Sequence, residues 1–258
     1  MIIDAFNAVF YQPLYNGLIF LISVLPGGSV GLAIIVLTLA VKFIILPLTH
    51  KSVASQAKMR SIEPEVAEVK KKYEKDKQEQ ARKVMELYQK HGINPFSGCL
   101  FIIVQIPVIL ALYWVFFRGL TELSPEFLYS FVTIPTLINF EFLGLFSMTG
   151  KSLFLALIAG ITQYYQITLS IPPKPPVKSS GVPTFKEEFA RNMGNQIRYV
   201  LPVIVFFFSY IISGAIALYW LTSNLFSIAH EVFVRRKVLD VRPVTEVEET
   251  KTPTTPTK

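Results

Sequence analysis

A lysine lies inside one of the most apolar stretches of the chain. Lys42 belongs to the run from Val30 to Leu48, within the sequence LTLAVKFIILPLTHK. If this run is a membrane helix, Lys42 lies about 4.5 Å to one side of its midpoint at Leu39. A lysine near the centre of such a helix costs roughly 2.5 to 3.5 kcal/mol and usually faces a bundle interior or a wet cavity. The alternative is that the side chain snorkels toward the headgroups, although from this depth its stem falls short without local thinning or water.

Polar residues in the other apolar runs indicate what surrounds this lysine. Thr38 precedes Lys42 by one turn on the same face. The others are Gln105, Gln163, Tyr219, Thr222, Ser223 and Asn224. Each could simply join neighbouring helices through a hydrogen bond. We favour one shared, hydrated pocket in the inner half of the bundle, holding a cation and no carboxylate, which suits the attraction of acidic groups.

No pattern typical of an enzyme's active site is present. His50, His91 and His230 lack the spacing of metal ligands, and no Ser or Cys has a plausible base beside it. A Gly-rich phosphate loop is also missing. The single cysteine, Cys99, excludes an intramolecular disulfide and is expected to pack as a small hydrophobe. We therefore expect a protein that is not an enzyme and that needs no cofactor and no metal.

The elements that position these residues are predicted to be membrane helices. The 258 residues are 52% apolar, with a net charge of +7 and a mean hydropathy of +0.46, as is typical of a multi-span membrane protein. The apolar runs are close to the length that crosses a bilayer, and the last is long enough for two helices broken at ISGA, Ile212 to Ala215. The fold class is therefore an all-α polytopic membrane protein with five transmembrane helices, at 30–50, 97–118, 151–171, 198–212 and 213–235.

Charge sets the expected orientation. Most of the 25 Lys and Arg fall in three groups, at 51–90, 174–198 and 235–258, which five spans place on one side of the membrane. The positive-inside rule makes that side cytoplasmic. We expect a multi-pass protein of the cell (inner or plasma) membrane, with the N-terminus outside and the C-terminus in the cytoplasm. Residues 1–29 are expected to form an outer interfacial helix rather than a span, and 119–150 an outer loop.

The cytoplasmic segments are predicted as a helical hairpin at 51–96, a loop at 172–197 and a disordered tail at 236–258. Apolar stripes support the hairpin, with Ile62, Val66, Val69 and Tyr73 on one helix and Ala81, Val84, Leu87 and Tyr88 on the other. Gly92 followed by Asn94-Pro95 is expected to end the second helix. Its mixed charges fit either a solvated face or the docking of a partner or anionic lipid.

Three separated motifs resemble, in order, the core of the YidC membrane protein insertases, the group that includes the mitochondrial and chloroplast insertases. They are VKFIILPLTHKSVASQAKMRSIEPEV, INPFSGCLFIIVQIPVILALYWVF and SGAIALYWLTSNL, and the resemblance covers about Tyr11 to Arg236. It implies five core helices around a hydrophilic groove that is open to the cytoplasm and to lipid. Nascent membrane proteins would enter this groove, be attracted by a positive charge, and leave sideways into the bilayer without ATP hydrolysis.

The resemblance also implies a set of groove residues. Lys42 stands where the family pattern has arginine, and Thr38 matches the threonine one turn before it. Gln105 and Pro107 match the edge of the path along which substrates slide, Gln163 matches a groove glutamine, and Tyr219 and Trp220 match an aromatic contact pair. Because lysine can lose its proton where guanidinium does not, a charge-dependent step is expected to be more sensitive to pH here.

Other departures affect local geometry and size. Phe101 and Ile212 stand where related sequences often have proline, and the chain is expected to lack the large outer domain that some members carry. A Sec-type translocon and the ribosome are candidate partners, and no small-molecule substrate is expected. The competing functions are a small-solute anion transporter or channel, which would need a pathway to the outside, and a scaffold, which would tolerate Lys42→Leu.

Overall fold

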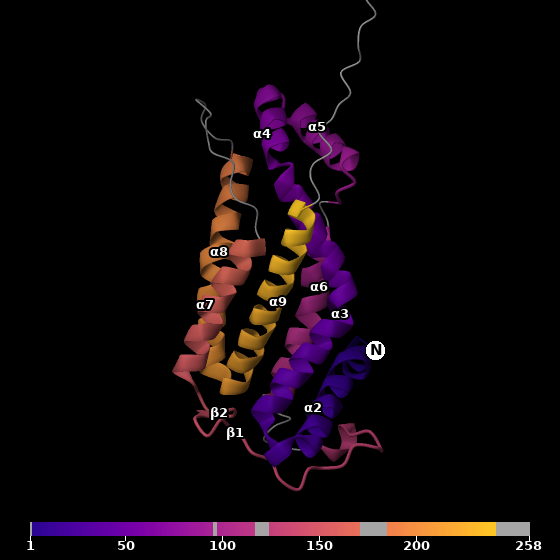
Figure 1. Cartoon of the computed structure of the whole chain (residues 1–258), viewed down its shortest axis with the longest axis vertical. Helices are drawn as coiled ribbons and strands as arrows, with labels where there is room; N and C mark the ends of the chain where they lie inside the picture. Colours follow the sequence, from indigo (N-terminus) through magenta and orange to yellow (C-terminus); the bar gives the residue numbers. More distant parts are fainter. Residues whose placement is uncertain (1, 95–96, 117–123, 171–184, 241–258) are drawn as a thin grey trace, which may run out of the picture.

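Long helices side by side form the body of the molecule in the computed structural model (Figure 1). The structure describes residues 2–94, 97–116, 124–170 and 185–240. The bundle consists of α3 (Val30–Ser61), α6 (Ser97–Trp114), α7 (Leu153–Ser170), α8 (Phe185–Ile212) and α9 (Gly214–Asp240). Helix α9 packs against α3, α7 and α8, while α6 packs against α3. The central position of α9 explains why every residue from Ala215 to Tyr219 is buried.

Three helices continue past the apolar runs that predicted them. Helix α3 extends from Val30 to Ser61 instead of ending near residue 50, and α8 begins at Phe185 instead of residue 198. Helix α9 continues to Asp240, five residues into the segment predicted as tail. The apolar run marks where a helix leaves hydrocarbon, whereas the helix itself can continue through polar residues in the headgroup layer and water. The Pro-rich segment 171–184, the tail 241–258 and the side chains of Cys99 and Phe101 lie outside the described residues.

Two helices in the described part of the chain, α3 and α7, are long and apolar enough to cross a membrane by length and composition. Shorter apolar helical segments run from Gln105 to Trp114 and from Gln196 to Ile212. Apolar side chains also lie exposed on the outer surface of the bundle, including Phe207, Phe208 and Ile211 of α8. The structure is mostly helical and is consistent with an all-α membrane protein. That five helices cross the membrane stays a prediction.

The first helices run along α3. Helix α1 (Ile2–Phe6), the π-helical turn η1 (Asn7–Tyr11) and α2 (Gln12–Val24) follow one another, and the 3₁₀ turn η2 (Pro26–Gly28) leads into α3. Helix α2 buries one face, with Tyr15, Leu18, Ile19 and Ile22 at 0–1% exposure. The Asn16 amide joins this helix to the distant 124–150 segment, since its Nδ2 donates to the Phe127 carbonyl and its Oδ1 accepts from the Tyr129 amide.

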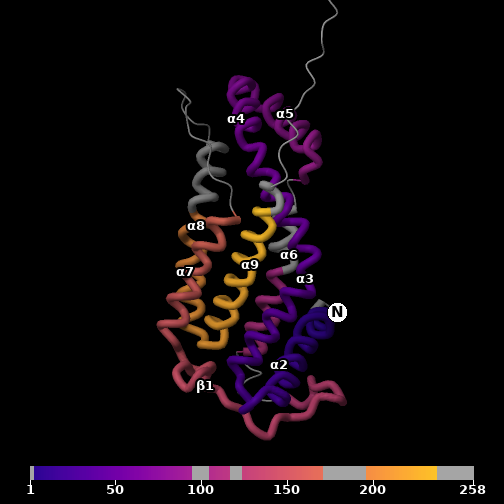
Figure 2. Tube along the Cα trace, viewed as in Figure 1, coloured from indigo at the N-terminus to yellow at the C-terminus, as the bar shows by residue number. Residues whose placement is uncertain are grey.

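Backbone hydrogen bonds join the start of α3 to the start of α9. The 124–150 segment contains the 3₁₀ turn η4 (Pro125–Phe127) and a small antiparallel hairpin, β1 (Glu141–Phe142) and β2 (Phe146–Ser147). The Val30 amide donates to Asn139, the Met148 amide donates to Phe140, and the Ala215 amide donates to Met148. This series lies at the end of the bundle opposite α4 and α5 (Figure 2).

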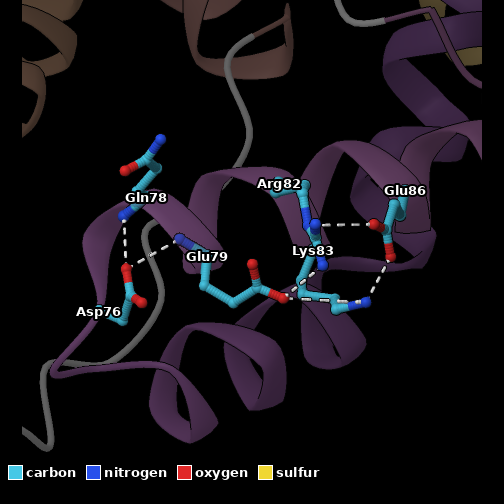
Figure 3. Close-up of polar contacts among 6 residues, drawn as sticks. All are labelled: Asp76, Gln78, Glu79, Arg82, Lys83 and Glu86. Carbon is cyan, nitrogen blue, oxygen red and sulfur yellow. Dashed lines mark hydrogen bonds and ion pairs between the residues drawn. The ribbon is translucent and has the colours of Figure 1, made fainter.

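The opposite end carries a helical hairpin of α4 (Glu63–Lys72) and α5 (Lys77–Lys90). Ile62, Val66 and Ile93 form a small core, with Val84, Leu87 and Tyr88 packed against it, whereas Ala81, which was predicted to belong to this stripe, is exposed. The small side chain of alanine gains little free energy from burial, so Ala81 does not determine which face of α5 turns inward. The Asp76 carboxylate caps α5 by accepting from the Gln78 and Glu79 amides, and Lys83 pairs with both Glu79 and Glu86 (Figure 3).

Candidate functional site

A polar stripe follows α9 through the middle of the bundle. Tyr219, Ser223, Ser227 and Glu231 lie four residues apart, and all but Ser227 are less than 9% exposed. Because four residues turn a helix by about 400°, each member is rotated by about 40° from the last. The stripe therefore meets different neighbours in turn, which are α6 at Tyr219, α3 at Ser227 and α7 at Glu231.

Lys42 is buried between α3 and α9. Its residue is 5% exposed, and Nζ lies 3.3 Å from the Ser227 hydroxyl oxygen, which in turn donates to the Ser223 carbonyl. Lys42 follows the first residue of α3 by twelve positions, or about 18 Å along the axis. The cation is thus held inside protein at mid-depth of the bundle, on the side toward the α4–α5 hairpin.

Thr38 is also buried on α3, at 3% exposure, but its hydroxyl serves its own helix by donating to the Ile34 carbonyl at 2.6 Å. This is the usual way in which an apolar helix satisfies a threonine. The Thr38 hydroxyl hydrogen is therefore already used within α3. Its oxygen still has a lone pair that can accept a hydrogen bond.

Gln105 and Tyr219 meet where α6 contacts α9, and Trp220 lies next to Tyr219. The Gln105 Nε2 donates to the Tyr219 hydroxyl at 2.8 Å, and the Gln105 Oε1 is buried without a hydrogen-bond partner in the described residues. Pro107 lies inside α6, where it removes one backbone donor. Tyr219 is 4% exposed and Trp220 is half-buried, with 6.3 Å between their ring centroids.

Gln163 lies on the other side of α9, on α7. It is 7% exposed and its Nε2 donates to Gln166, which donates to Ser170, which donates to Glu231. Asn224 makes a second link by donating to the Ala159 carbonyl and to the Thr162 hydroxyl. The hydrogen bonds described so far thus form two networks around α9, one with α3 and α6 and one with α7, and a shared hydrated pocket stays a prediction.

Glu231 corrects one expectation. The buried polar region was predicted to contain no carboxylate, but Glu231 is 4% exposed inside the bundle, with Oε1 2.6 Å from Arg235 Nη2 and Oε2 2.7 Å from the Ser170 hydroxyl. A buried carboxylate is tolerated when it is paired and hydrogen-bonded. The spacing of Glu231 and Arg235, four residues apart, was the signal in the sequence that could have identified the pair.

Two further contacts had no signal in the sequence. His50 of α3 and His230 of α9 lie 3.2 Å apart between Nδ1 and Nε2, although 180 positions separate them. Ser227, the partner of Lys42, belongs to a residue type that is common in membrane helices for packing alone. Both contacts depend on the register between α3 and α9, which side-chain patterns do not set.

Comparison with known proteins identifies relatives. The family described as 60Kd inner membrane protein matches residues 21–240. Proteins called "Membrane protein insertase YidC" from Francisella tularensis subsp. novicida (strain U112) and subsp. tularensis (strain SCHU S4 / Schu 4) are each 31% identical over 209 residues, which is 81% of this chain. The chain spans about a third of the length of these relatives, since the match covers 33% of each.

Proposed function

This chain belongs to the 60Kd inner membrane protein family, and we propose that it is a membrane protein insertase. Its substrates are hydrophobic segments of nascent membrane proteins, which enter a positively charged groove and leave sideways into the bilayer. The proposal includes five membrane crossings, an outer N-terminus and a cytoplasmic C-terminus. It also includes insertion without ATP hydrolysis, with a Sec-type translocon and the ribosome as candidate partners.

The single observation that carries the proposal is the buried ammonium of Lys42. It lies within the bundle at 5% exposure, against the polar stripe of α9 through Ser227. A carboxylate that arrives beside this ammonium would gain a charge-assisted hydrogen bond, which is stronger than a bond between neutral groups. A soluble acidic tail can thereby be drawn part of the way through the hydrocarbon layer.

The physical work of insertion has two parts. A polar lining reduces the cost of carrying unpaired backbone groups into the membrane, which is several kcal/mol for each group in hydrocarbon. The following apolar segment then gains about 25 cal/mol per Å² as it leaves water for lipid. A membrane potential of about 100 mV adds roughly 2.3 kcal/mol for each negative charge moved outward. The favourable free energy thus comes from burial of the substrate's apolar segment and from the membrane potential, so insertion needs no nucleotide.

The route into lipid is proposed to follow α6 and α9. Gln105 and Tyr219 lie at the junction of these helices, Trp220 is next to Tyr219, and Pro107 follows Gln105 by two residues in α6. Ile106 and Leu110 of α6 and Leu225 of α9 are about half exposed, as suits side chains that meet lipid. A substrate helix passing this junction would exchange contact with Tyr219 and Trp220 for contact with acyl chains.

The test is insertion into liposomes that contain only this purified protein. The substrate is a small single-span protein with an acidic outer tail, and insertion is scored by protection from protease. We expect Lys42→Met to lower protection on the order of tenfold, since it removes the attracting charge. Lys42→Arg should retain insertion, because guanidinium keeps the charge and matches the residue type found in the family.

The controls separate charge from folding. Lys42→Met should retain the melting temperature of the unchanged protein, because a buried charge is replaced by an apolar side chain of similar size. A matched substrate with a neutral tail should lose little protection with this variant. Normal insertion of the acidic substrate by Lys42→Met would reject the groove charge, and equal protection in empty liposomes would reject autonomous insertion.

An anion transporter is the alternative from another class. It requires a polar path from Lys42 to the outer surface, whereas the described residues above Lys42 on α3 that face inward include the fully buried Val30, Ala33 and Ile34. The 124–150 segment also covers that end of α3 through the bond between Val30 and Asn139. Uptake of a small anion by liposomes containing the protein, lost in Lys42→Met, would favour this alternative.

A further inference from the structure

Three arginines gather where the bundle ends below the α4–α5 hairpin. Arg60 of α3 donates through Nη2 to the Thr168 carbonyl at 3.4 Å, in the last turn of α7. Arg235 of α9 pairs with Glu231, whose other oxygen accepts from Ser170 at the end of the same α7 turn. Arg198 of α8 precedes Tyr199, whose ring lies 5.9 Å from that of Tyr164 on α7. Arg60 and Arg235 thus lie at the end of α7, and Arg198 on the neighbouring α8 lies close enough to Arg60 to repel it.

Charge in this cluster is unbalanced. The Arg60 guanidinium is repelled by Arg235 and Arg198 and attracted by Glu231 and Glu63. Glu231 already uses one oxygen for Arg235 and the other for Ser170. Among the side chains that the structure describes, three guanidinium groups therefore interact with two carboxylates. The Nε of Arg198 is buried with no hydrogen-bond partner in the described part of the chain. Like charges held together in a partly buried site are unfavourable unless an anion joins them.

The depth of the cluster indicates which anion. From the outer ends of their helices, Thr168 lies about 23 Å along α7, Arg198 about 21 Å along α8, and Glu231 about 26 Å along α9. The hydrocarbon core is about 30 Å thick, and arginine stems reach several Å toward the nearer headgroups. The end of α7 and the nearby Arg198 and Glu231 therefore lie near the inner boundary of the hydrocarbon, next to the layer that holds lipid phosphates. Arg60, about 45 Å along the longer α3, reaches the same place from the cytoplasmic side through its bond to the Thr168 carbonyl.

We propose that Arg60, Arg198 and Arg235 bind the phosphate group of an anionic lipid in the cytoplasmic leaflet. Planar guanidinium groups bind phosphate oxygens with paired, charge-assisted hydrogen bonds. The lipid links α3, α8 and α9 at the one end of the bundle where the hairpin leaves. This inference rests on the membrane orientation of the proposed function but not on insertion activity, and its test measures lipid rather than insertion.

The first experiment uses the full chain without substitutions. Its melting temperature is compared in nanodiscs of phosphatidylcholine and in nanodiscs that also contain phosphatidylglycerol, and native mass spectrometry counts the phosphatidylglycerol retained after detergent extraction. We expect a higher melting temperature with phosphatidylglycerol and at least one tightly retained lipid. Equal melting in both membranes with no retained lipid would overturn the proposal. Stabilisation by inorganic phosphate in lipid-free detergent, to the same extent, would overturn the assignment to lipid.

The second experiment uses Arg198→Gln, with Arg236→Gln as its matched control. Arg198→Gln removes a guanidinium whose buried Nε makes no hydrogen bond, so it sacrifices little in the fold. Arg236 is an exposed neighbour of Arg235 with the same charge. We expect Arg198→Gln to weaken retention of phosphatidylglycerol on the order of tenfold, and Arg236→Gln to change it less than twofold. An equal loss of phosphatidylglycerol retention in both variants would mean that only the general surface charge matters, and this would overturn the site. Unchanged retention in both variants would overturn it as well.

The stability of the Arg198→Gln variant is measured separately from its lipid binding. The melting temperature of Arg198→Gln in phosphatidylcholine alone should equal or exceed that of the unchanged chain, because a repulsion with Arg60 is removed. Arg198→Lys serves as the conservative variant and should retain part of the binding, since it keeps the charge but loses the planar fork. If Arg198→Lys retained no more lipid than Arg198→Gln, phosphate recognition by charge at this position would be wrong.

Discussion

At the scale of single residues, the polar side chains inside the bundle differ in what they already bind. Thr38 and Thr222 donate to carbonyls one turn earlier in their own helices. Gln105 and Tyr219 instead bind one another across two helices. Hydrogen bonds between helices depend on how the helices are placed, whereas bonds within one helix do not. The Gln105–Tyr219 bond is therefore a test of the junction through which a substrate is proposed to leave.

The bond between Gln105 and Tyr219 can be measured directly. Tyr219→Phe removes the hydroxyl and leaves the Gln105 amide without that acceptor. Interhelical hydrogen bonds in membranes contribute about 0.6 kcal/mol on average and up to about 1.7. We expect Tyr219→Phe to destabilise the protein by an amount in this range, read as a lower melting temperature in nanodiscs.

A double substitution separates the bond from the cost of an unpaired amide. Gln105→Leu combined with Tyr219→Phe should recover part of the stability, because neither partner is left buried without the other. If the two single effects simply added, the contact between α6 and α9 would not exist in the membrane. The same pair of variants, tested for insertion, would show whether this junction also affects release.

At the scale of elements, the α4–α5 hairpin depends on local signals. Asp76 accepts from the Gln78 amide at 3.1 Å and the Glu79 amide at 3.0 Å, which satisfies two donors at the start of α5 (Figure 3). Asp76→Ala should cost about 1 kcal/mol of local stability. Hydrogen exchange of α5 amides in the full chain should therefore accelerate about fivefold, as expected for a local loss of that size.

The control for this substitution is Asp76→Asn, which keeps a capping oxygen and should slow exchange again toward the original rate. Exchange in α7 should not change in either variant, because the cap lies on the opposite side of the α3 extension. Unchanged α5 exchange in Asp76→Ala would mean that the small core around Val66 holds the hairpin without the cap.

The turn between α8 and α9 depends on a glycine. The Gly214 amide donates to the Gly150 carbonyl at 2.7 Å, and a Cβ on Gly214 would collide with the Ser147 backbone oxygen. Backbone cannot move aside as a side chain can, so Gly214→Ala should destabilise by about 1 to 3 kcal/mol, as overpacked sites do. Its melting temperature in nanodiscs should fall accordingly.

Gly17→Ala is the matched control for the glycine. A Cβ there would meet only the far end of the Leu37 side chain, at 3.1 Å. That methyl group can rotate away, and alanine is favoured over glycine within a helix. Gly17→Ala should therefore leave the melting temperature unchanged or raise it. A larger loss in Gly17→Ala than in Gly214→Ala would contradict the packing at the α8–α9 turn.

At the scale of the whole molecule, the hairpin and the 124–150 segment lie at opposite ends (Figure 1). The proposed orientation is tested with single cysteines in a Cys99→Ser background. Leu145→Cys, at a position 76% exposed, should react with an impermeant thiol reagent on intact cells. Glu74→Cys, at the exposed turn of the hairpin, should react only after the membrane is opened. The reverse pattern would overturn the proposed orientation.

The sequence predicts the class of this protein because membrane helices and buried charges obey strong energetic limits. A lysine within hydrocarbon costs enough that Lys42 was recognisable as a special residue, and three motifs in order identified the family, which the comparison confirms. The end of α5 near Gly92 was predictable for the same reason, because Gly92 has a φ of 63° and glycine adopts positive φ without a steric penalty. These features depend on one residue and its immediate neighbours.

Features that depend on register between helices could not be predicted. The contact of Lys42 with Ser227 and that of His50 with His230 each need α3 and α9 at one particular offset. The backbone bonds at Asn139 and Met148 involve groups that every residue carries, so no side-chain pattern marks them. Glu231 differs from these contacts, since the spacing of Glu231 and Arg235 within one helix carried a signal that the sequence analysis did not use.

The hydrogen bonds from Val30 through Asn139 and Met148 to Ala215 give the molecule a fixed pivot at one end. Any rotation between α3 and α9 must then grow in amplitude with distance from that pivot. A rotation of about 10° displaces Lys42, about 18 Å away, by roughly 3 Å, and displaces Arg60, about 45 Å away, by roughly 8 Å. The first displacement is enough to separate Lys42 from Ser227. A small angular change at the linked end would therefore move the hairpin end of α3 much farther than the end that the hydrogen bonds hold.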